Sequence, residues 1–539
     1  MVGSIRESHE PTDETFYVNM GPADGGGYCQ CDGCRELDGD SYDPLRNAPS
    51  MTDRYIWFFN RVLEELEDDY PNMHIVWYVY AAHFFPPEHN DPNPRIIGTF
   101  APIDLDRNRG MDNPMSPDRH IFRHIIDGWA ELEPNALNYR GYYNNLACPQ
   151  FPWSQLERVR NEIPALYEKG LDVFRVEVIR QSWASSPITL YAASRVMWDV
   201  DTDVDALLDE FYAKFYGPAE QPMRAYLEGI ESAFADTPYH TGSSYVYLPI
   251  FTDERRDTLR GYLEEATSVA PRDGEGLYGE RVWAAAKGFE RMEIFLDMIE
   301  ARNNHDYETA ESKRHEYYEL NDMLADYVLE GEDLRDQRQR HALVNRMERS
   351  DRGGYFDRFF RPAVESGYHR TVEAGELVKG LPDEWEFLID PVEIGEIAGY
   401  YRPGELGGNW QPLKTTSLSW SDQGMHYYKG VAWYRISVTI PEGFEDRPMY
   451  LWLGGVDRVA HVWINGQYVG SSQAPEEGLP GAPGTFRPVD MPATNAVRHG
   501  QENWVTVMIE SRDRLAELGT GGLIAPVMFW SPSDPDWSP

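Results

Sequence analysis

The sequence predicts a multidomain protein with an α/β part followed by an all-β part, and three observations support this fold class. At 539 residues the chain is too long for a single hydrophobic core. Residues 16–200 alternate short apolar runs with amphipathic helical segments, while residues from 393 onward form short runs between Gly and Pro turns. We therefore expect a (β/α)8-type barrel domain over residues 1–200, a helical domain over 201–345, a connecting region over 346–392 and a β-sandwich over 393–539.

Five strands separated by amphipathic helices are expected in the first domain. The strands are Phe16–Met20, His74–Ala81, Arg95–Ala101, Ala136–Tyr143 and Asp172–Ile179. The helices between them are Asp53–Glu67, Asp118–Leu132 and Ser154–Lys169. This alternation implies a parallel sheet with helices packed outside it. Because a closed barrel needs eight strands, we expect the later part of a barrel that lacks its first strands.

Helical patterns and then strand patterns follow along the chain. Asp203–Tyr216 and Gln221–Phe234 have helical periodicity, and a longer apolar stripe predicts a helix-bundle core: Val282, Ala285, Ala286, Phe289, Met292, Leu296 and Ile299. Strands are expected at Val431–Ile440, Met449–Gly454, Ala460–Ile464, Gln467–Gly470 and Trp504–Glu510. Asn465-Gly466 is a strong signal for a hairpin turn. Short strands without intervening helices predict a β-sandwich.

The charge of the chain excludes two classes of partner. The formal charge is −41, and the acidic residues are spread along the whole sequence. Such a surface repels phosphate backbones and anionic lipids, so we expect neither nucleic acid nor a membrane as partner. Of the 49 basic residues, 42 are arginine, a bias typical of halophilic proteins and equally of a GC-rich genome. No apolar run of about 18 residues occurs that could span a membrane.

One stretch near the N-terminus combines several chemically active side chains. In FYVNMGPADGGGYCQCDGCREL, a predicted strand runs into a Gly-rich turn that carries Asp24. A carboxylate at the carboxyl end of a barrel strand is well placed to act as an acid or a base, and the glycines let a substrate approach the backbone. The alternative is that Asp24 only caps the turn by accepting backbone N–H groups.

The same stretch contains three of the four cysteines, Cys29, Cys31 and Cys34. Neighbours at this spacing form a poor disulfide, so a shared metal ion or a set of free thiols is the more natural interpretation. A zinc ion would need a fourth ligand, and Cys148 is the candidate because loops at one end of a barrel converge. Four thiolates would make the site structural, since they leave no position for water.

Glu177 is the candidate second carboxylate because it lies in the predicted strand DVFRVEVI. Glycoside hydrolysis uses two carboxyl groups, about 5–5.5 Å apart for retention of configuration or about 6.5–9.5 Å apart for inversion. Strand ends of one barrel can supply such a pair, here Asp24 and Glu177, and this chemistry requires no cofactor. The alternative for Glu177 is a structural ion pair with Arg175 or Arg180.

Aromatic and polar side chains crowd the same strand ends. Flat aromatic faces pack against sugar rings, while phenol and indole groups hydrogen-bond hydroxyls. The candidate substrate-binding residues are Tyr80, His83, Asp104, Tyr139, Tyr142 and Trp183. The alternative for some of them is ordinary barrel core. Their density at loop junctions favours a cleft for carbohydrate.

Several segments resemble a known family. GPADGGGYCQCDGC, YVYAAHFFPPE, the stretch ending PQFPW and LYAASRVMWDVDTDVDALLDEFYAKFYGPAEQPMRAYL resemble the domain of unknown function DUF4838 over residues 14–235. That family is similar to glycoside hydrolases of the α-glucuronidase and hexosaminidase type. The resemblance implies a role in polysaccharide degradation, with Asp24 and the cysteines as the family's own motif. The chain departs from the family in lacking the early barrel strands and in having Arg140-Gly141-Tyr142 where an acidic residue is expected.

A second resemblance covers residues 393–532. WYRISVTIPEGFEDRPMYLWLGGVDRVAHVWINGQYVGSS is similar to the galactose-binding-like jelly roll attached to β-galactosidase-type enzymes. Together the two resemblances imply a glycoside hydrolase-like protein that acts on a polysaccharide or oligosaccharide. The alternatives are a non-catalytic carbohydrate-binding or scaffold protein and an inactive fragment of a longer hydrolase.

The first residues of the chain bear on the cellular location of the protein. Residues 1–15 lack the basic and then apolar pattern of a signal peptide, which makes a cytoplasmic location the default. Secretion would nevertheless suit a polysaccharide substrate. The sequence leaves the oligomeric state open.

Overall fold

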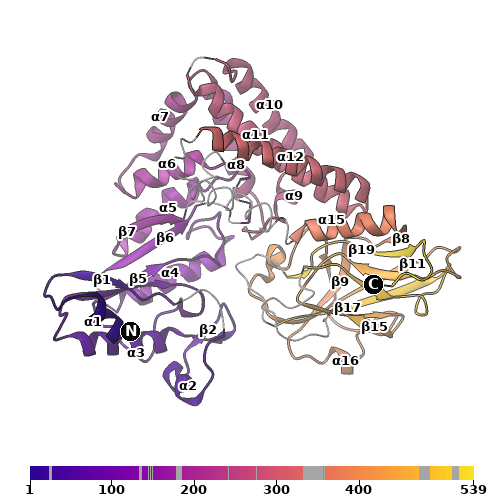
Figure 1. Cartoon of the computed structure of the whole chain (residues 1–539), viewed down its shortest axis with the longest axis horizontal. Coiled ribbons are helices and arrows are strands. Elements are labelled where there is room, and N and C mark those ends of the chain that lie inside the picture. Colours follow the sequence, from indigo (N-terminus) through magenta and orange to yellow (C-terminus); the bar gives the residue numbers. More distant parts are fainter. Residues whose placement is uncertain are drawn as a thin grey trace. The chain divides into compact units, whose positions relative to one another are not determined.

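The computed structural model shows a chain divided into two compact units (Figure 1). One unit comprises residues 1–145, 153–220 and 230–235, and the other comprises residues 146–152, 221–229 and 236–539. The structure describes all residues except 23–26, 133–135, 144, 146, 149, 178–184, 241, 275, 332–355, 357–358, 473–485, 513–520 and 539, and no side chains for 325–331. Within the described residues, no helix combines the length and apolar character needed to cross a membrane.

The first unit is built on a five-stranded parallel sheet. The strands are β1 (Phe16–Asn19), β4 (Met73–Val79), β5 (Ile96–Phe100), β6 (Leu137–Tyr142) and β7 (Leu171–Glu177). Their order in the sheet, β1-β4-β5-β6-β7, follows their order along the chain, and every neighbouring pair is parallel. This is the arrangement of half a barrel, and it confirms the predicted α/β fold class.

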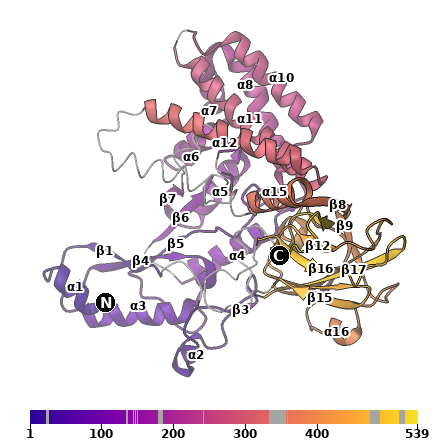
Figure 2. The same ribbon diagram turned by 45° about the vertical axis from the view of Figure 1, so that its right-hand side comes forward.

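Helices cover one face of this sheet (Figures 1 and 2). The helices of the unit are α1 (Val2–Ser8), α2 (Asp32–Asp38), α3 (Thr52–Leu66), α4 (Pro117–Ala130), α5 (Leu156–Glu168), α6 (Pro187–Val196) and α7 (Val204–Tyr216). A small hairpin is formed by β2 (Tyr42–Asp43) and β3 (Ala48–Pro49), and the 3-10 turn η1 is Ala81–His83. Trp77 of β4 packs against Phe59 of α3 and Trp129 of α4, with ring centroids 5.2 and 6.1 Å apart.

The predicted strands and helices of this unit lie within one to three residues of the observed ones. The unit extends beyond the expected boundary at residue 200, because α7 packs against α6 and belongs to it. The next helix, α8 (Glu220–Ala235), is shared between the two units. The periodicity of α7 identified it as a helix but could not show which core it joins.

The second unit joins helices to a β-sandwich. Its further helices are α9 (Tyr247–Ile250), α10 (Asp253–Val269), α11 (Tyr278–Asn303), α12 (Tyr307–Gly331) and α15 (Arg361–Tyr368). Within the unit, Tyr307 packs edge-on against Trp452 of the sandwich at 5.7 Å, and Arg302 donates to the Thr416 carbonyl oxygen at 3.2 Å. The stripe predicted as helix-bundle core lies on α11, where Val282, Met292 and Leu296 are fully buried.

The sandwich contains two main antiparallel sheets. One has the order β10-β9-β11-β17-β14-β15 and the other β16-β12-β19-β8, and β13 pairs with β18. The strands are β8 (Gly375–Gly380), β9 (Glu384–Asp390), β10 (Gln411–Lys414), β11 (Gly430–Thr439), β12 (Tyr450–Leu453), β13 (Val456–Asp457), β14 (Val459–Ile464), β15 (Gln467–Ser471), β16 (Val489–Pro492), β17 (Glu502–Ser511), β18 (Gly522–Leu523) and β19 (Val527–Pro532). The predicted Asn465-Gly466 hairpin joins β14 to β15, with both residues at positive φ.

The expected connecting region contains two strands of the sandwich. β8 pairs with β19, and β9 pairs with both β10 and β11. The β-sandwich therefore begins near residue 375 and not at 393. The break at Gly380-Leu381-Pro382 resembled a linker in the sequence, but it is the turn by which the chain passes from one sheet to the other.

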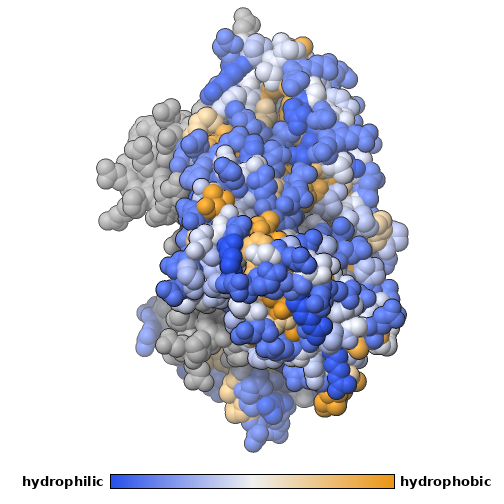
Figure 3. All heavy atoms as spheres, turned by 90° about the vertical axis from the view of Figure 1, so that its right-hand side faces the viewer, coloured by the Kyte–Doolittle hydropathy of each residue, from blue (hydrophilic) through white to orange (hydrophobic). Residues whose placement is uncertain are grey.

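The surface agrees with the acidic composition. Figure 3 shows a face on which hydrophilic residues predominate and hydrophobic residues are scattered in small areas. A hydrophilic surface of this kind keeps a protein hydrated and dispersed, and it carries no information about catalysis.

Candidate functional site

The face of the parallel sheet opposite the helices carries a row of polar side chains at the carboxyl ends of the strands. Along β4, Trp77 points to the helices, and Tyr78 therefore points to the other face. Tyr78 is in register with Thr99 of β5, and Thr99 with Asn138 of β6. Arg140, two residues beyond Asn138, lies on the same face.

Glu177 is tied to this row by a chain of polar contacts. Its carboxylate forms an ion pair with Arg140, and Arg140 donates to the Tyr78 hydroxyl at 2.7 Å. The Arg140 guanidinium also lies 5.1 Å from the centre of the Tyr78 ring. The Glu177 side chain is 31% exposed, so a ligand can reach it. Among the described residues, the ion-pair partner of Glu177 is Arg140, the residue that departs from the family pattern, and not the expected Arg175. The other expected partner, Arg180, lies outside the described residues.

Two predicted site residues lie outside the described part of the chain. These are Asp24, the candidate acid or base, and Trp183, a candidate substrate-binding residue. Asp24 follows β1 in the sequence, and Trp183 follows β7. The pairing of Asp24 with Glu177 therefore stays a prediction.

Asp104 and His83 are both buried in this region. Asp104, in the loop after β5, forms an ion pair with Arg46. His83 stacks on Trp77 with ring centroids 5.2 Å apart, and its other ring neighbours include Tyr80 at 5.3 Å. Burial, assisted by the charge of Arg46, lowers the pKa of His83 to about 3. His83 is therefore a neutral aromatic support for Tyr80, which is the half-buried member of the pair.

The two tyrosines predicted from β6 have different surroundings. Tyr142 is in register with Glu177 and lies on the same face of the sheet. Tyr139 lies on the helix side, fully buried, where it donates a hydrogen bond to Glu162 of α5. Tyr139 thus belongs to the support of the site and not to its ligand-facing surface. The sequence of this apolar strand does not show whether Tyr139 lies on the helix-covered face of the sheet or on the opposite face.

A buried charge network behind the sheet holds the loops of the site. Glu162 accepts hydrogen bonds from Arg119 of α4 at 3.1 Å and from Arg158 of α5 at 2.8 Å, and all three side chains are fully buried. Arg119 donates to the Asp106 carbonyl oxygen at 2.6 Å, and Arg158 donates to the carbonyl oxygens of Arg107 and Tyr142, both at 3.0 Å. Burial opposes ionisation of Glu162, but the two guanidinium groups outweigh it and lower its pKa.

Asp53 holds the loop that follows β4 and η1. This buried carboxylate, in the first turn of α3, accepts backbone N–H groups of Glu88, His89 and Asn90 at 3.0, 2.8 and 2.9 Å and the Ser41 hydroxyl at 2.7 Å. Burial raises its pKa, but these hydrogen bonds together lower it below the ordinary value. In the sequence Asp53 looked like the start of a helix, and only the fold shows that it caps a distant loop.

Replacing Asp53 with asparagine is expected to lower the free energy of unfolding by about 2 kcal/mol at pH 7, because an amide nitrogen then faces backbone donors. A carboxylate with a lowered pKa stabilises the fold above its ordinary pKa, and this contribution is lost as the pH falls through the folded value. The difference between the two proteins should therefore shrink below about pH 4. Urea denaturation across this range measures it, with the exposed Asp68→Asn as control. An equal loss in both variants would contradict the role of Asp53.

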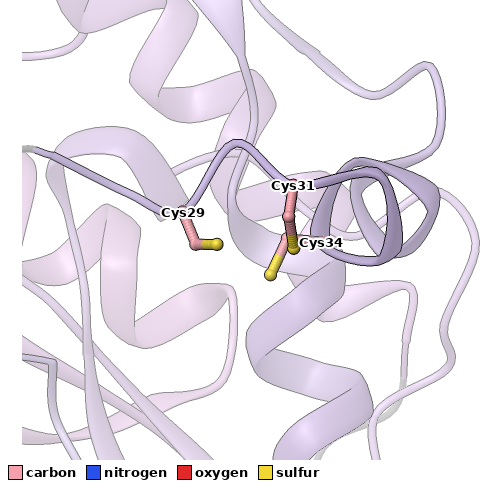
Figure 4. A group of neighbouring side chains, drawn as sticks. All are labelled: Cys29, Cys31 and Cys34. Atoms are coloured by element: carbon pink, nitrogen blue, oxygen red, sulfur yellow. The ribbon is translucent and has the colours of Figure 1, made fainter.

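The cysteine cluster lies at the start of α2 (Figure 4). The Sγ atoms of Cys29, Cys31 and Cys34 all lie within 4.8 Å of one another, and none of the three forms a disulfide. Hydrogen bonds from Cys34 and Cys29 lower the pKa of Cys31 to about 7. The pKa of Cys34 is raised to about 11 by its hydrogen bonds with Cys31 and Cys29. Cys148 belongs to the other unit, where its Sγ lies 3.0 Å from the Ser244 hydroxyl. Its assignment as the fourth ligand stays a prediction.

Two family models match the chain and confirm both resemblances noted in the sequence. The domain of unknown function DUF4838 matches residues 1–228, and the beta-galactosidase second all-beta domain matches residues 395–514. The first match covers the half-barrel and the second covers most of the β-sandwich, and each covers less than half of the chain. The first part of the chain is thus similar to DUF4838 domains, and the second part is similar to the all-beta domain of beta-galactosidases.

Relatives of known identity match short parts of the chain. A beta-galactosidase of Thermoanaerobacter pseudethanolicus is 27% identical over 103 residues, which are 19% of this chain and 12% of the relative. A beta-glucuronidase of Paenibacillus borealis is 26% identical over 143 residues, which are 25% of this chain and 21% of the relative. The solved beta-glucuronidase from Ruminococcus gnavus is 20% identical, covers 30% of this chain and 31% of that chain, and gives a TM-score of 0.24.

Proposed function

We propose that the α/β unit hydrolyses glycosidic bonds of an oligosaccharide or polysaccharide, with Glu177 as one of its two carboxylates. The observation that carries this proposal is the place of Glu177: it ends a parallel strand, is partly exposed and lies on the helix-free face of the sheet. The names of the relatives, beta-galactosidase and beta-glucuronidase, support a carbohydrate substrate.

The surroundings of Glu177 favour one of the two roles that the reaction requires. An ion pair with a guanidinium stabilises the ionised carboxylate, which suits a nucleophile or a general base. Arg140 would thus hold Glu177 charged and, through the Tyr78 hydroxyl, fix its orientation. The other role is protonation of the leaving oxygen, and we assign it to Asp24, which lies in the Gly-rich segment that follows β1 in the sequence.

The full chain should be assayed on β-linked galactosides and glucuronides and on a panel of polysaccharides. Glu177→Gln and Asp24→Asn are each expected to lower kcat at least about a hundredfold. Glu168→Gln is the matched control, because this exposed carboxylate lies at the end of α5, just before β7 begins and thus at the opposite end of that strand from Glu177. Hydrolysis that persists unchanged in Glu177→Gln would remove this residue from the mechanism.

The second candidate function is carbohydrate binding without cleavage. The observation that favours it is the ion pair of Glu177 with Arg140, because a carboxylate with only a structural role is held in the same way. The assay separates the two functions when it is combined with calorimetric titration. A glycan that binds wild type and Glu177→Gln equally, and that neither protein cleaves, would establish a binding module.

A further inference from the structure

The geometry points to a function for the cysteines that is separate from glycoside hydrolysis: we propose that Cys29, Cys31 and Cys34 bind one zinc ion. They would supply three thiolates and leave the fourth position open to water or another exchangeable donor. In Figure 4 the side chain of Cys29, in the loop before α2, is directed toward Cys31 and Cys34 at the start of that helix.

The spacing of the sulfur atoms suits tetrahedral zinc. With Zn–S bonds of about 2.3 Å, two thiolates of a tetrahedral site lie about 3.8 Å apart. The three Sγ atoms already lie within 4.8 Å of one another. Side-chain rotations that move the sulfur atoms by about 1 Å would therefore bring them to the spacing that zinc requires. Thiolates are the preferred ligands of soft and borderline cations such as zinc. A site of three thiolates disfavours hard cations such as Mg²⁺, which prefer oxygen ligands.

The chain on either side of the thiols is fixed independently of any ion. Arg54 of α3 donates to the Cys29 carbonyl oxygen at 3.2 Å and to the Cys34 carbonyl oxygen at 3.4 Å. The same guanidinium is paired with Asp38, the buried last residue of α2. Arg54 thus attaches the loop and both ends of α2 to α3. The entropy cost of ordering the backbone around the thiols therefore belongs to folding and does not reduce the affinity for an ion.

Exposure of the cluster argues for an open coordination position. Cys29 and Cys31 are exposed and Cys34 is half-buried, so solvent can reach the position that three thiolates leave free on a tetrahedral ion. Without a metal, the two exposed thiols would also be open to oxidation. In the sequence, the three cysteines follow the Gly-rich segment that contains Asp24, so the ion would fix the chain just after it.

Zinc content measured by elemental analysis tests the proposal. After incubation of the full chain with equimolar zinc and removal of unbound metal, about one ion per chain should remain. Cys31→Ser should retain less than about a tenth of that amount, since three thiolates share the ion. His89→Gln is the matched control, because Asp40, Glu88 and His89 are the other group of potential ligands among the described residues. Equal zinc content in wild type and Cys31→Ser would overturn the proposal.

Two further measurements keep the proposal testable even if Cys31→Ser does not fold. A chelator should expose three additional thiols of the wild-type protein to alkylation, and identical alkylation before and after chelation would overturn the site. Cys148→Ser should keep its zinc, and loss of the ion from this variant would overturn the open fourth position. None of these readouts depends on hydrolytic activity, so the zinc site and the proposed function can fail separately.

Discussion

Glu162→Gln is expected to lower the free energy of unfolding of the α/β unit by about 3–5 kcal/mol. Among the described residues, Glu162 is the carboxylate that pairs with both Arg119 and Arg158, so its substitution leaves two buried cations without a counter-charge. The desolvation cost of those cations then falls entirely on the folded state. Chemical denaturation, followed by tryptophan fluorescence at pH 7, measures the loss.

A surface ion pair provides the control for this experiment. Asp205 pairs with Arg160, and its side chain is 81% exposed. Asp205→Asn should therefore change the stability by less than about 1 kcal/mol. A loss in Glu162→Gln no greater than that of Asp205→Asn would mean that the guanidinium groups are hydrated or find other acceptors, and the buried network would not act as described.

Asp422→Asn should change how the stability of the second unit depends on pH. Asp422 is buried and accepts the Ser243 hydroxyl at 2.8 Å and the Ser419 backbone N–H and hydroxyl at 2.9 and 2.7 Å. Burial raises its pKa to about 6, against the opposing effects of these hydrogen bonds and of the charge on His240. The His240 and His426 rings stack nearby, with centroids 3.8 Å apart. Both histidines are present in the variant and in wild type, so the comparison of the two proteins isolates the effect of Asp422.

The sign of the effect follows from proton binding. A carboxyl group whose pKa is higher in the folded state holds its proton longer there, so its stabilising contribution is complete below pH 3.8 and is lost as the pH rises through 6. A shift of about 2 units corresponds to about 3 kcal/mol. Relative to wild type, Asp422→Asn should thus gain about 3 kcal/mol between pH 4 and pH 7.

Denaturation curves collected at several pH values would show this gain. The exposed Asp446 provides the control, since Asp446→Asn should follow the wild-type curve throughout. A constant difference between Asp422→Asn and wild type across the range would show that Asp422 titrates alike in both states.

The sequence predicted the elements of this fold better than their assembly. Apolar periodicity located all five strands of the parallel sheet, because each is a short segment rich in apolar residues between turn residues. The strands β8 and β9 were missed because they lie next to Gly380-Leu381-Pro382, and local composition at a turn cannot show that both flanking segments pair with strands over 40 residues away. The assignment of α7 to the first unit likewise depends on tertiary packing.

The candidate site was predictable in its residue types but not in its partners. Glu177 and Tyr142 were predicted as site residues, and the two lie in register on the neighbouring strands β6 and β7. The roles of Arg140 and Arg46 were missed, since an ion pair between different strands or loops leaves no spacing rule in the sequence. Tyr139 was misplaced because strand alternation shows that neighbours point to opposite faces, yet it does not show which face the helices cover.

The anchorage of the loops above the sheet has a consequence for how this scaffold can change. Arg119 and Arg158 bind the carbonyl oxygens of Asp106, Arg107 and Tyr142, which are main-chain atoms present whatever the side chain. Substitutions in those loops can therefore alter the ligand-facing surface while the guanidinium contacts remain. The loop side chains can vary because the loop backbone is held by arginines on the helix side of the sheet. This is a physical basis for the acquisition of new specificities on an unchanged framework.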